Sequence, residues 1–464
     1  MRFLQINQLW LAPSSQESEV AGGAANPVIR ELCQMSQILD ELPNIEEVYQ
    51  RIRRDLVGDR RTDCGRTGLT AEQALRAALI KEKLGLTWRE LEFHLSDSLV
   101  LRSFAKLEPT KRVSKSILNR DVRLISEETW QFFNEGMKQY AAQTGMEDGA
   151  CLRSDTTATE TNIHHPTDSR LLCDCIRVLT RLMQRAADGL GVALEYCDHN
   201  RRAAKRLYSI HNAKNDDVRR GHYRDLIRVA EWTRDYAKMA LAVVQAHVSL
   251  DLSEGLLRDA IVEEIQHYLP LTEKVLSQTI RRVLNGENVP AAEKVVSIFE
   301  PHTDIIEKGC RDTIFGHKVC IGSGKSGLIL DCIVLEGNPA DSTLVNDILQ
   351  RHRESYGAPP EQIVFDGGFS SAANAAHVKE QGVRDAVFAK RKGFDPLEYV
   401  SSMKVLKALM HFRAGIEAGI SVLKRAYGMT RVFAKGWRAF KTSLLNGVAA
   451  FNLTLIARYQ LQRA

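Results

Sequence analysis

Apolar residues recur at helical spacing through most of the first 140 residues. Leucines at positions 75, 79, 84, 91, 95 and 99 predict short helices. Thr70 followed by Gln73, and Thr87 followed by Glu90, have the spacing of capping boxes at helix starts. With Gly85 in the turn between them, these helices resemble a helix-turn-helix arrangement, and basic residues flank them. We expect a helical DNA-binding domain over residues 30–140; a plain helical bundle with solvated charges is the alternative.

The pattern changes at residues 149–163, where threonines dominate and the helical period disappears. This composition predicts one or two strands, with Asp155 in the middle. Long helices then return over residues 169–292. Within 201–228, nine Arg or Lys residues face three Asp residues, an excess that favours a surface facing a polyanion over a plain surface helix.

From residue 294 onward, apolar runs of strand length precede and then alternate with helical patterns. One run, 363–365, ends in Asp366 and two glycines. In the helix near the C-terminus, Glu417 and Lys424 lie about 40° and 20° from Arg413, so the three share one face beside an apolar stripe. Several strands followed by alternating helices and strands predict an α+β or α/β protein of several domains, with a mixed sheet.

Composition narrows the class of protein. A chain of 464 residues with 44% hydrophobic and 26% charged residues is typical of a globular protein with two to four domains, and its charge of +5 is only mildly basic. Nine cysteines without a C-x-x-C pair indicate reduced thiols in the cytoplasm and argue against zinc. No apolar run approaches 18 residues, so no membrane span is expected. The polar N-terminus predicts a short strand and a tail rather than a secretion signal.

Two motifs resemble known binding sites but do not match them. The segment GSGKS (322–326) resembles a phosphate-binding loop, but Val319 stands where that loop needs glycine, and the flanks predict a β-hairpin. No nucleotide cofactor is therefore expected. His164 and His165 are adjacent, so their side chains diverge on an extended segment and do not suit one shared metal ion.

Three carboxylates have contexts that suit phosphodiester chemistry. Asp155 is in a strand, Asp366 follows a strand, and Glu417 is on a helix at the edge of the core. Hard oxygen ligands suit two Mg²⁺ ions, or Mn²⁺, held about 3.5–4 Å apart to activate the attacking oxygen and stabilise the leaving one. In that arrangement Arg413 and Lys424 would contact DNA phosphates rather than pair with Glu417.

The same residues carry a family resemblance. The segment from Asp155 to residue 169, the segment VFDGGF around Asp366, and the spacing Arg413-x3-Glu417-x6-Lys424 resemble the DDE transposases of bacterial insertion sequences, most closely the ISNCY group. Residues 65–95 are similar to the helical domain that opens many such enzymes, so the resemblance covers most of 60–455. One departure is Met410, which stands where the family signature has a tyrosine that contacts DNA.

The resemblance implies an RNase H-like catalytic core interrupted by a helical insertion. The expected division is an N-terminal tail (1–29), a DNA-binding domain (30–140), the first part of the core (141–169), the insertion (170–292) and the second part of the core (293–464). The resemblance also implies a bacterial, nucleoid-associated enzyme that works as a homodimer or larger assembly. Such an enzyme binds the terminal inverted repeats of its element, nicks DNA with water, and uses the freed 3′-OH to attack target DNA.

Two other functions remain open: an inactive DNA-binding derivative, and an RNase H-like nuclease without strand transfer. Glu160 and Asp168 are the alternative acids. A regular strand turns Glu160 away from Asp155, and Asp168 is expected to cap the next helix. The residues expected to contact DNA are Arg413, Lys424, Arg66, Trp88, Lys111, Arg112, Lys115, Arg201, Arg202, Arg206, Arg219 and Arg220.

Overall fold

The computed structural model describes residues 26–58, 68–108, 110–249, 251–307, 313–390 and 393–463. The expected N-terminal strand and tail, and the expected DNA contact of Arg66, lie outside these residues. The chain forms two compact units: unit 1 is Met1–Glu160 with His317–Ala464, and unit 2 is Thr161–Gly316.

The N-terminal part of unit 1 is helical, as predicted. Its helices are α2 (Pro27–Glu41), α3 (Ile45–Val57), α4 (Ala71–Lys83), α5 (Trp88–Asp97), α6 (Leu99–Phe104), α7 (Lys115–Leu124) and α8 (Glu127–Gln143). Both predicted capping boxes are formed, at Thr70 with Gln73 and at Thr87 with Glu90. Gly85 adopts a φ of +63° in the turn between α4 and α5.

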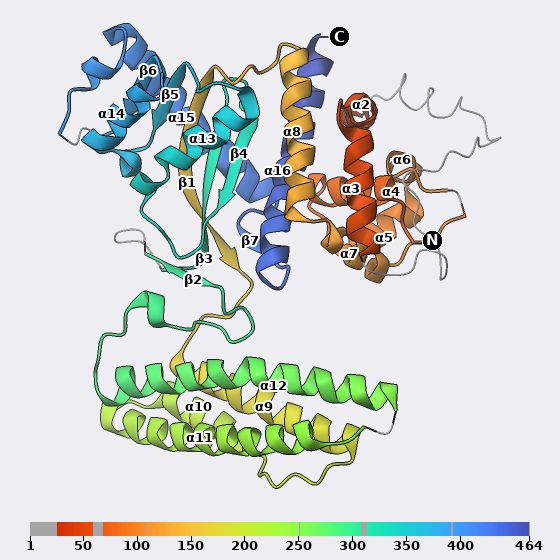
Figure 1. The fold of residues 1–464 in the computed structure, drawn as a ribbon, viewed down its shortest axis with the longest axis vertical. Helices are drawn as coiled ribbons and strands as arrows, with labels where there is room; N and C mark the ends of the chain where they lie inside the picture. The colour runs from red at the N-terminus through yellow and green to blue at the C-terminus, as the bar shows by residue number, and fades with distance from the viewer. Residues whose placement is uncertain are drawn as a thin grey trace. The chain divides into compact units, whose positions relative to one another are not determined.

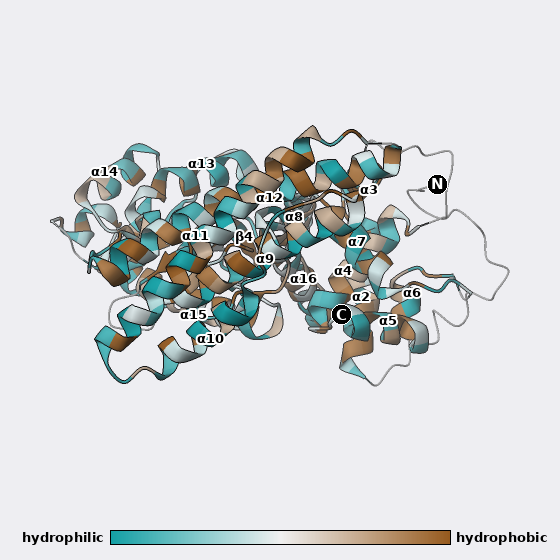
Figure 2. Cartoon of the chain, turned by 90° about the horizontal axis from the view of Figure 1, so that it is seen from below, coloured by the Kyte–Doolittle hydropathy of each residue, from teal (hydrophilic) through white to brown (hydrophobic). Residues whose placement is uncertain are grey.

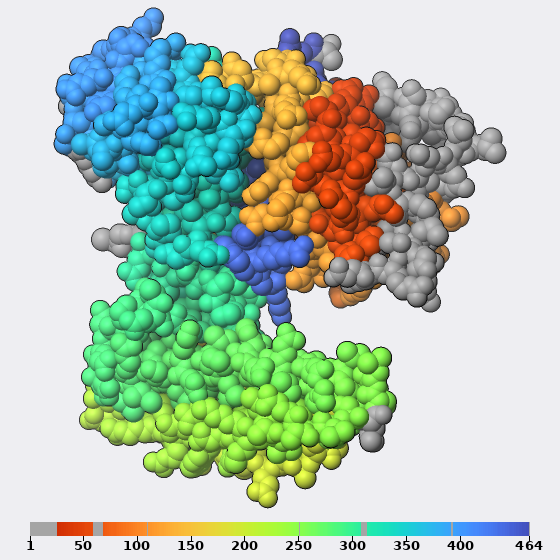
Figure 3. Space-filling view, viewed as in Figure 1, coloured from red at the N-terminus to blue at the C-terminus, as the bar shows by residue number. Residues whose placement is uncertain are grey.

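The C-terminal helix α16 (Trp437–Arg463) joins these helices to the rest of unit 1. It packs on α8, α2 and α4, and also on strand β4 (Ile329–Val334). In Figure 3, α8 forms the surface between the red N-terminal helices and the cyan and blue remainder of the unit. One continuous hydrophobic core therefore runs from the N-terminal helices to the sheet.

Within the described residues, the sheet has seven strands in the order β2-β3-β1-β5-β6, with β4 paired to β3 and β7 paired to β1. The parallel neighbours are β1, β5 and β6, while β2 and β4 run antiparallel to β3. The remaining strand bounds are β1 (Cys151–Thr161), β2 (Asp304–Ile306), β3 (Ile314–Ser323), β5 (Gln362–Phe365), β6 (Asp385–Phe388) and β7 (Arg431–Val432). A mixed sheet with packed helices is consistent with the RNase H-like core that the resemblance implies.

The expected hairpin at GSGKS is confirmed. Strands β3 and β4 pair from Val319↔Val334 to Ser323↔Ile329, and the glycine-containing segment turns between them. Because no helix follows the turn, its backbone amides do not converge on a phosphate as those of a nucleotide-binding loop do.

Helices pack on both faces of the sheet (Figure 1). They are α13 (Val345–Tyr356), α14 (Ala372–Glu380) and α15 (Met403–Ala426), with short 3₁₀ turns η3 (Asp341–Thr343), η4 (Gly367–Phe369) and η5 (Pro396–Tyr399). Along β1, Arg153 stacks on Phe412 of α15, whereas Leu152 and Ser154 border a small cavity beneath α13. Alternate residues of a strand point to opposite faces, so α13 and α15 cover opposite sides of β1.

In its described residues, unit 2 is built around four helices. They are α9 (Asp168–Leu190), α10 (Asn200–Asn212), α11 (Asp216–Ala246) and α12 (Leu252–Thr279), followed by a π-helical turn η1 (Ile280–Leu284) and a 3₁₀ turn η2 (Ala291–Glu293). Their apolar faces form a separate core. In Figure 2, teal and brown segments alternate along α11. This alternation is expected for an amphipathic helix, because its hydrophilic and hydrophobic faces come into view in turn. Within the described residues, no helix has the length and apolarity needed to cross a membrane.

Candidate functional site

Two of the predicted acids lie side by side because of the strand pairing. Strands β1 and β5 are parallel with Ser154 opposite Phe365, so the next positions along the two strands are Asp155 and Asp366. Asp366 follows the last residue of β5, and Asp155 is half-buried in the middle of the longer β1. Sheet register therefore brings together two residues that are 211 positions apart in the chain.

The third acid is linked to the second through a cation. Nη1 of Arg413 lies 3.1 Å from Oδ1 of Asp366 and 3.4 Å from Oε1 of Glu417. The expectation that Arg413 would not pair with Glu417 is wrong for this structure. Because the two residues are four positions apart on α15, their side chains meet on one face of the helix. Nε of Arg413 is buried and has no hydrogen-bond partner, so the guanidinium keeps an unused donor.

The carboxylates of Asp155, Asp366 and Glu417 are ligands that suit a hard divalent cation. In this structure, however, Arg413 is paired with two of them. Carboxylate oxygens are the ligands that Mg²⁺ and Mn²⁺ prefer. Among the described residues, however, no three His, Cys, Asp or Glu side chains come close enough to hold one ion together. Asp366 and Glu417 are held by one guanidinium nitrogen, and Asp155 Oδ1 accepts a hydrogen bond from the amide of Thr156 at 2.7 Å.

A buried arginine connects the strand of Asp155 to the helix of Glu417. Arg153 is only 8% exposed. Its Nε donates to Oγ of Ser323 at 2.7 Å, and its Nη1 donates to the carbonyl of Phe412 at 2.8 Å. A Cβ atom at Gly415 would lie 2.0 Å from that Nη1, so glycine is needed where the guanidinium crosses α15. Sequence reasoning missed Arg153, because nothing local distinguishes it from other strand residues.

On the opposite face of the sheet, Asp341 connects three segments near the acids. Its Oδ1 accepts from the hydroxyl of Thr156 at 3.2 Å and from the ammonium of Lys318 at 3.1 Å. Its Oδ2 would lie 2.4 Å from a Cβ at Gly368, so this carboxylate packs closely against the turn after Asp366. Asp341 therefore links β1, β3 and that turn on the face of the sheet opposite Arg153.

The other predicted residues of the core have local partners. Glu160 forms an ion pair with Arg431 of β7. Lys424 lies in the last turn of α15, where its carbonyl accepts from the hydroxyl of Thr430 at 2.8 Å.

The expected capping role of Asp168 is wrong. Helix α9 begins at Asp168 itself, and the hydroxyl of Thr167 caps it by accepting from the amide of Arg170. Asp168 is buried in unit 2 and accepts from Arg282 at 2.8 Å. Burial raises the pKa of its carboxyl group, and the cation beside it acts in the opposite direction.

The residues expected to bind DNA in the N-terminal helices fall into two groups. Trp88 packs against the core with the ammonium of Lys81 5.0 Å from its ring centre. The ammonium of Lys111 donates to Oε1 of Gln73 at 2.8 Å, so it fastens the start of α4. Arg112 and Lys115, in contrast, are exposed.

The basic segment of unit 2 is likewise divided. Arg202 and Arg206 both pair with Asp225, and Arg219 pairs with Asp216. The remaining Arg and Lys residues of the segment 201–228 are exposed without an ion pair in the described structure: Arg201, Lys205, Lys214, Arg220, Arg224 and Arg228. A positive surface therefore persists after the internal pairs are subtracted.

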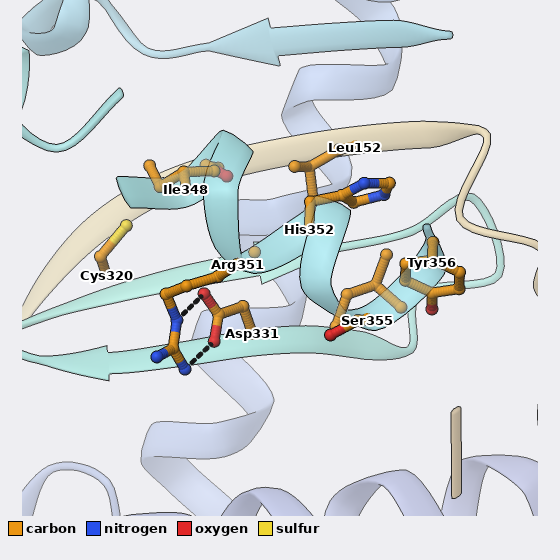
Figure 4. Close-up of a pocket in the computed structure, with 11 residues that line it drawn as sticks. Leu152, Cys320, Asp331, Ile348, Arg351, His352, Ser355 and Tyr356 are labelled. Carbon is orange, nitrogen blue, oxygen red and sulfur yellow. Dashed lines mark hydrogen bonds and ion pairs between the residues drawn. The ribbon is translucent and has the colours of Figure 1, made fainter. Parts of the chain in front are cut away.

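A small cavity lies between the sheet and α13, on the face away from Arg153 (Figure 4). Its volume is about 10 Å³, and Leu152, Cys320, Ile348 and Tyr356 are among the residues that line it. Beside it, Arg351 of α13 makes a two-pronged ion pair with Asp331 of β4, at 2.7 and 2.8 Å. This space holds at most a water molecule, so it is no substrate pocket.

Comparison with known proteins gives one match. Residues 294–453 match the family model described as a transposase DDE domain. The matched segment is about a third of the chain and contains Asp366, Arg413 and Glu417, while Asp155 lies before it. No curated protein and no solved structure matches the chain.

Proposed function

Because residues 294–453 match the family model of a transposase DDE domain, we propose that this chain is a transposase that cuts the ends of a mobile DNA element and joins them to target DNA. In this proposal Asp155, Asp366 and Glu417 form the catalytic centre, and the DNA ends are terminal inverted repeats. Two or more copies of the chain would hold the paired ends.

One observation carries the proposal. Parallel pairing sets Asp155 beside Asp366, and Arg413 holds Glu417 to the same carboxylate. Strand register thus links Asp155 to Asp366, and one guanidinium links Asp366 to Glu417, which supports a site built from these three acids. Asp366 and Glu417 are 44% and 62% exposed, so a DNA backbone has access to them.

The side chains have distinct roles in this mechanism. The three carboxylates would hold two divalent cations, which when bound supply an activated water or 3′-hydroxyl and neutralise charge on the leaving oxygen. Asp155 would contribute its carboxylate from β1, beside the strand end that carries Asp366. Arg153 sets the distance from β1 to α15, and Arg413 is a cation positioned to contact the phosphate at the cut.

Two positive surfaces supply DNA binding in this proposal. Arg112 and Lys115 are exposed near the start of α7, and the unpaired cations of α10, α11 and the segment between them form the second surface. Exposed Lys and Arg side chains increase the affinity of a protein for DNA of any sequence, because their binding to phosphates releases counterions.

The decisive experiment measures cleavage and binding separately. The DNA flanking the gene is sequenced, and its terminal inverted repeats serve as a labelled substrate with Mg²⁺ or Mn²⁺. We expect Asp155→Asn, Asp366→Asn and Glu417→Gln each to lower the cleavage rate at least about a thousandfold, since the lost stabilisation is worth several kcal/mol. Binding to the ends should persist.

Glu361→Gln is the matched control, because Glu361 lies next to the opposite end of β5 in an exposed ion pair with Arg384. Its cleavage rate should equal that of the unaltered protein. If Asp155→Asn cut normally while Glu160→Gln did not, the first acid would be reassigned. Product analysis separates joined target DNA, which supports a transposase, from cut ends alone, which indicate a nuclease; binding without cutting indicates an inactive derivative.

A further inference from the structure

A lysine that the family resemblance does not include lies at the same edge of the sheet as the acids. Strands β5 and β6 are parallel and pair up to Phe365↔Phe388. The amide of Ala389 donates to the carbonyl of Phe365 at 3.0 Å, so the pairing extends past the end of β6. The next residue, Lys390, consequently lies beside Gly367, the neighbour of Asp366.

The backbone and stem of Lys390 are fixed at this place. A Cβ atom at Gly367 would lie 2.7 Å from both Cγ and Cδ of Lys390, which means that the lysine stem crosses the glycine in close contact. The hydroxyl of Ser370 donates to the carbonyl of Lys390 at 2.6 Å, which ties the lysine to the turn after Asp366. These two contacts fix the position of Lys390 relative to the turn after Asp366.

The charge of Lys390 is not neutralised by a neighbour. The residue is exposed, and none of the carboxylates in the described ranges forms an ion pair with it. The other cation at this edge, Arg413, is shared between Asp366 and Glu417. Lys390 lies beside Gly367, the neighbour of Asp366, and has no ion pair there, so its ammonium is available for an anion from outside the chain.

We propose that Lys390 binds a backbone phosphate of the DNA strand that is cut, next to the reacting phosphate. The inference rests on the proposed function, because it assigns a contact at that same site. A lysine ammonium binds a phosphate as a compact point charge, without the two-pronged geometry of arginine. The competing explanation is that Lys390 only shields Gly367 from solvent.

The test separates the charge of Lys390 from its stem. Lys390→Met keeps an apolar chain over Gly367 and removes the charge, whereas Lys390→Arg restores a cation. The control is Lys379→Ala: Lys379 is half-buried, and its ammonium binds the carbonyl of Arg384 next to the amino end of β6. Binding to end DNA is measured from about 50 to 200 mM salt, and cleavage is measured under single-turnover conditions.

We expect Lys390→Met to reduce the slope of log K against log salt by about 0.9, the value for one phosphate contact. Its single-turnover cleavage rate should fall about tenfold, as for the loss of one charge-assisted hydrogen bond. Lys390→Arg should restore most of both quantities, and Lys379→Ala should change neither.

The outcomes distinguish the inference from the function on which it rests. If the unaltered protein neither binds nor cuts the ends, the proposed function fails. If it cuts, and Lys390→Met keeps the full salt slope and rate, then Lys390 is only a cover for Gly367 and the inference is overturned. If Lys390→Met and Lys390→Arg lose activity equally without a change in slope, a packing role is indicated and the phosphate contact is refuted.

Discussion

Replacement of Gly415 by alanine tests how strand β1 and helix α15 are held together. Gly415 lies between Arg413 and Glu417 in sequence, inside α15. A Cβ atom there would lie 2.0 Å from Nη1 and 2.8 Å from Cζ of Arg153. Since real side chains do not approach this closely, the guanidinium must move or the helix must shift.

The size of the effect follows from what Arg153 would lose. Its hydrogen bonds to Ser323 and to the carbonyl of Phe412 involve a charged donor, and each is worth about 1.5–3 kcal/mol. Losing one or both costs about 2–5 kcal/mol. Alanine is a better helix former than glycine by about 1 kcal/mol. The balance predicts a net destabilisation of about 1–4 kcal/mol.

Gly419, one turn further along α15, is a matched control. A Cβ atom there meets nothing within 4 Å. The same glycine-to-alanine change should therefore stabilise the protein by about 1 kcal/mol, because only the helix propensity changes. Two identical substitutions in one helix are thus expected to have opposite signs.

Urea unfolding followed by tryptophan fluorescence measures both variants. Trp88, Trp130 and Trp437 lie in unit 1, so the signal reports mainly on that unit. In an Arg153→Met background, Gly415→Ala should lose its cost, which gives a coupling energy of at least about 2 kcal/mol. If Gly415→Ala were as stabilising as Gly419→Ala, the guanidinium would move freely, and the assigned role of Arg153 in spacing β1 and α15 would be refuted.

Two further predictions concern charge. Arg202 and Arg206 both hydrogen-bond to Asp225; these bonds hold its pKa near 2. Asp225→Asn should free both guanidiniums and tighten DNA binding, with a steeper salt dependence; a filter-binding titration that showed no change would argue against this DNA surface. Burial of Asp385 raises its pKa, but hydrogen bonds, chiefly from Ser401, outweigh this effect and lower the pKa to about 2. The folded state thus binds this proton less readily than the unfolded state, so stability from Asp385 is complete above about pH 4 and is lost as the pH falls towards 2. Asp385→Asn should flatten the pH dependence of unfolding in that window, and an unchanged profile would contradict this assignment.

Local pattern was sufficient for the types of element. The leucine spacing and the threonine caps at Thr70 and Thr87 predicted helices that the structure contains, because helical contacts are made within four residues. The hairpin at residues 322–326 was also predictable, since Val319 and the flanking apolar runs exclude a phosphate-binding loop. Where local rules compete, the prediction failed by one residue: Thr167, not Asp168, caps α9.

The neighbours of each functional residue were decided only by the tertiary structure. The sequence contained the three acids and their family spacing, and it assigned Arg413 to DNA rather than to Glu417. Only the parallel register places Asp155 beside Asp366, and only the packing of α15 on the sheet brings Arg153 against Gly415. The position of Lys390 over Gly367 follows from the same register one strand further along. Periodicity reports which face of an element is buried, whereas contacts across a sheet depend on strand order, and strand order is set by the chain as a whole.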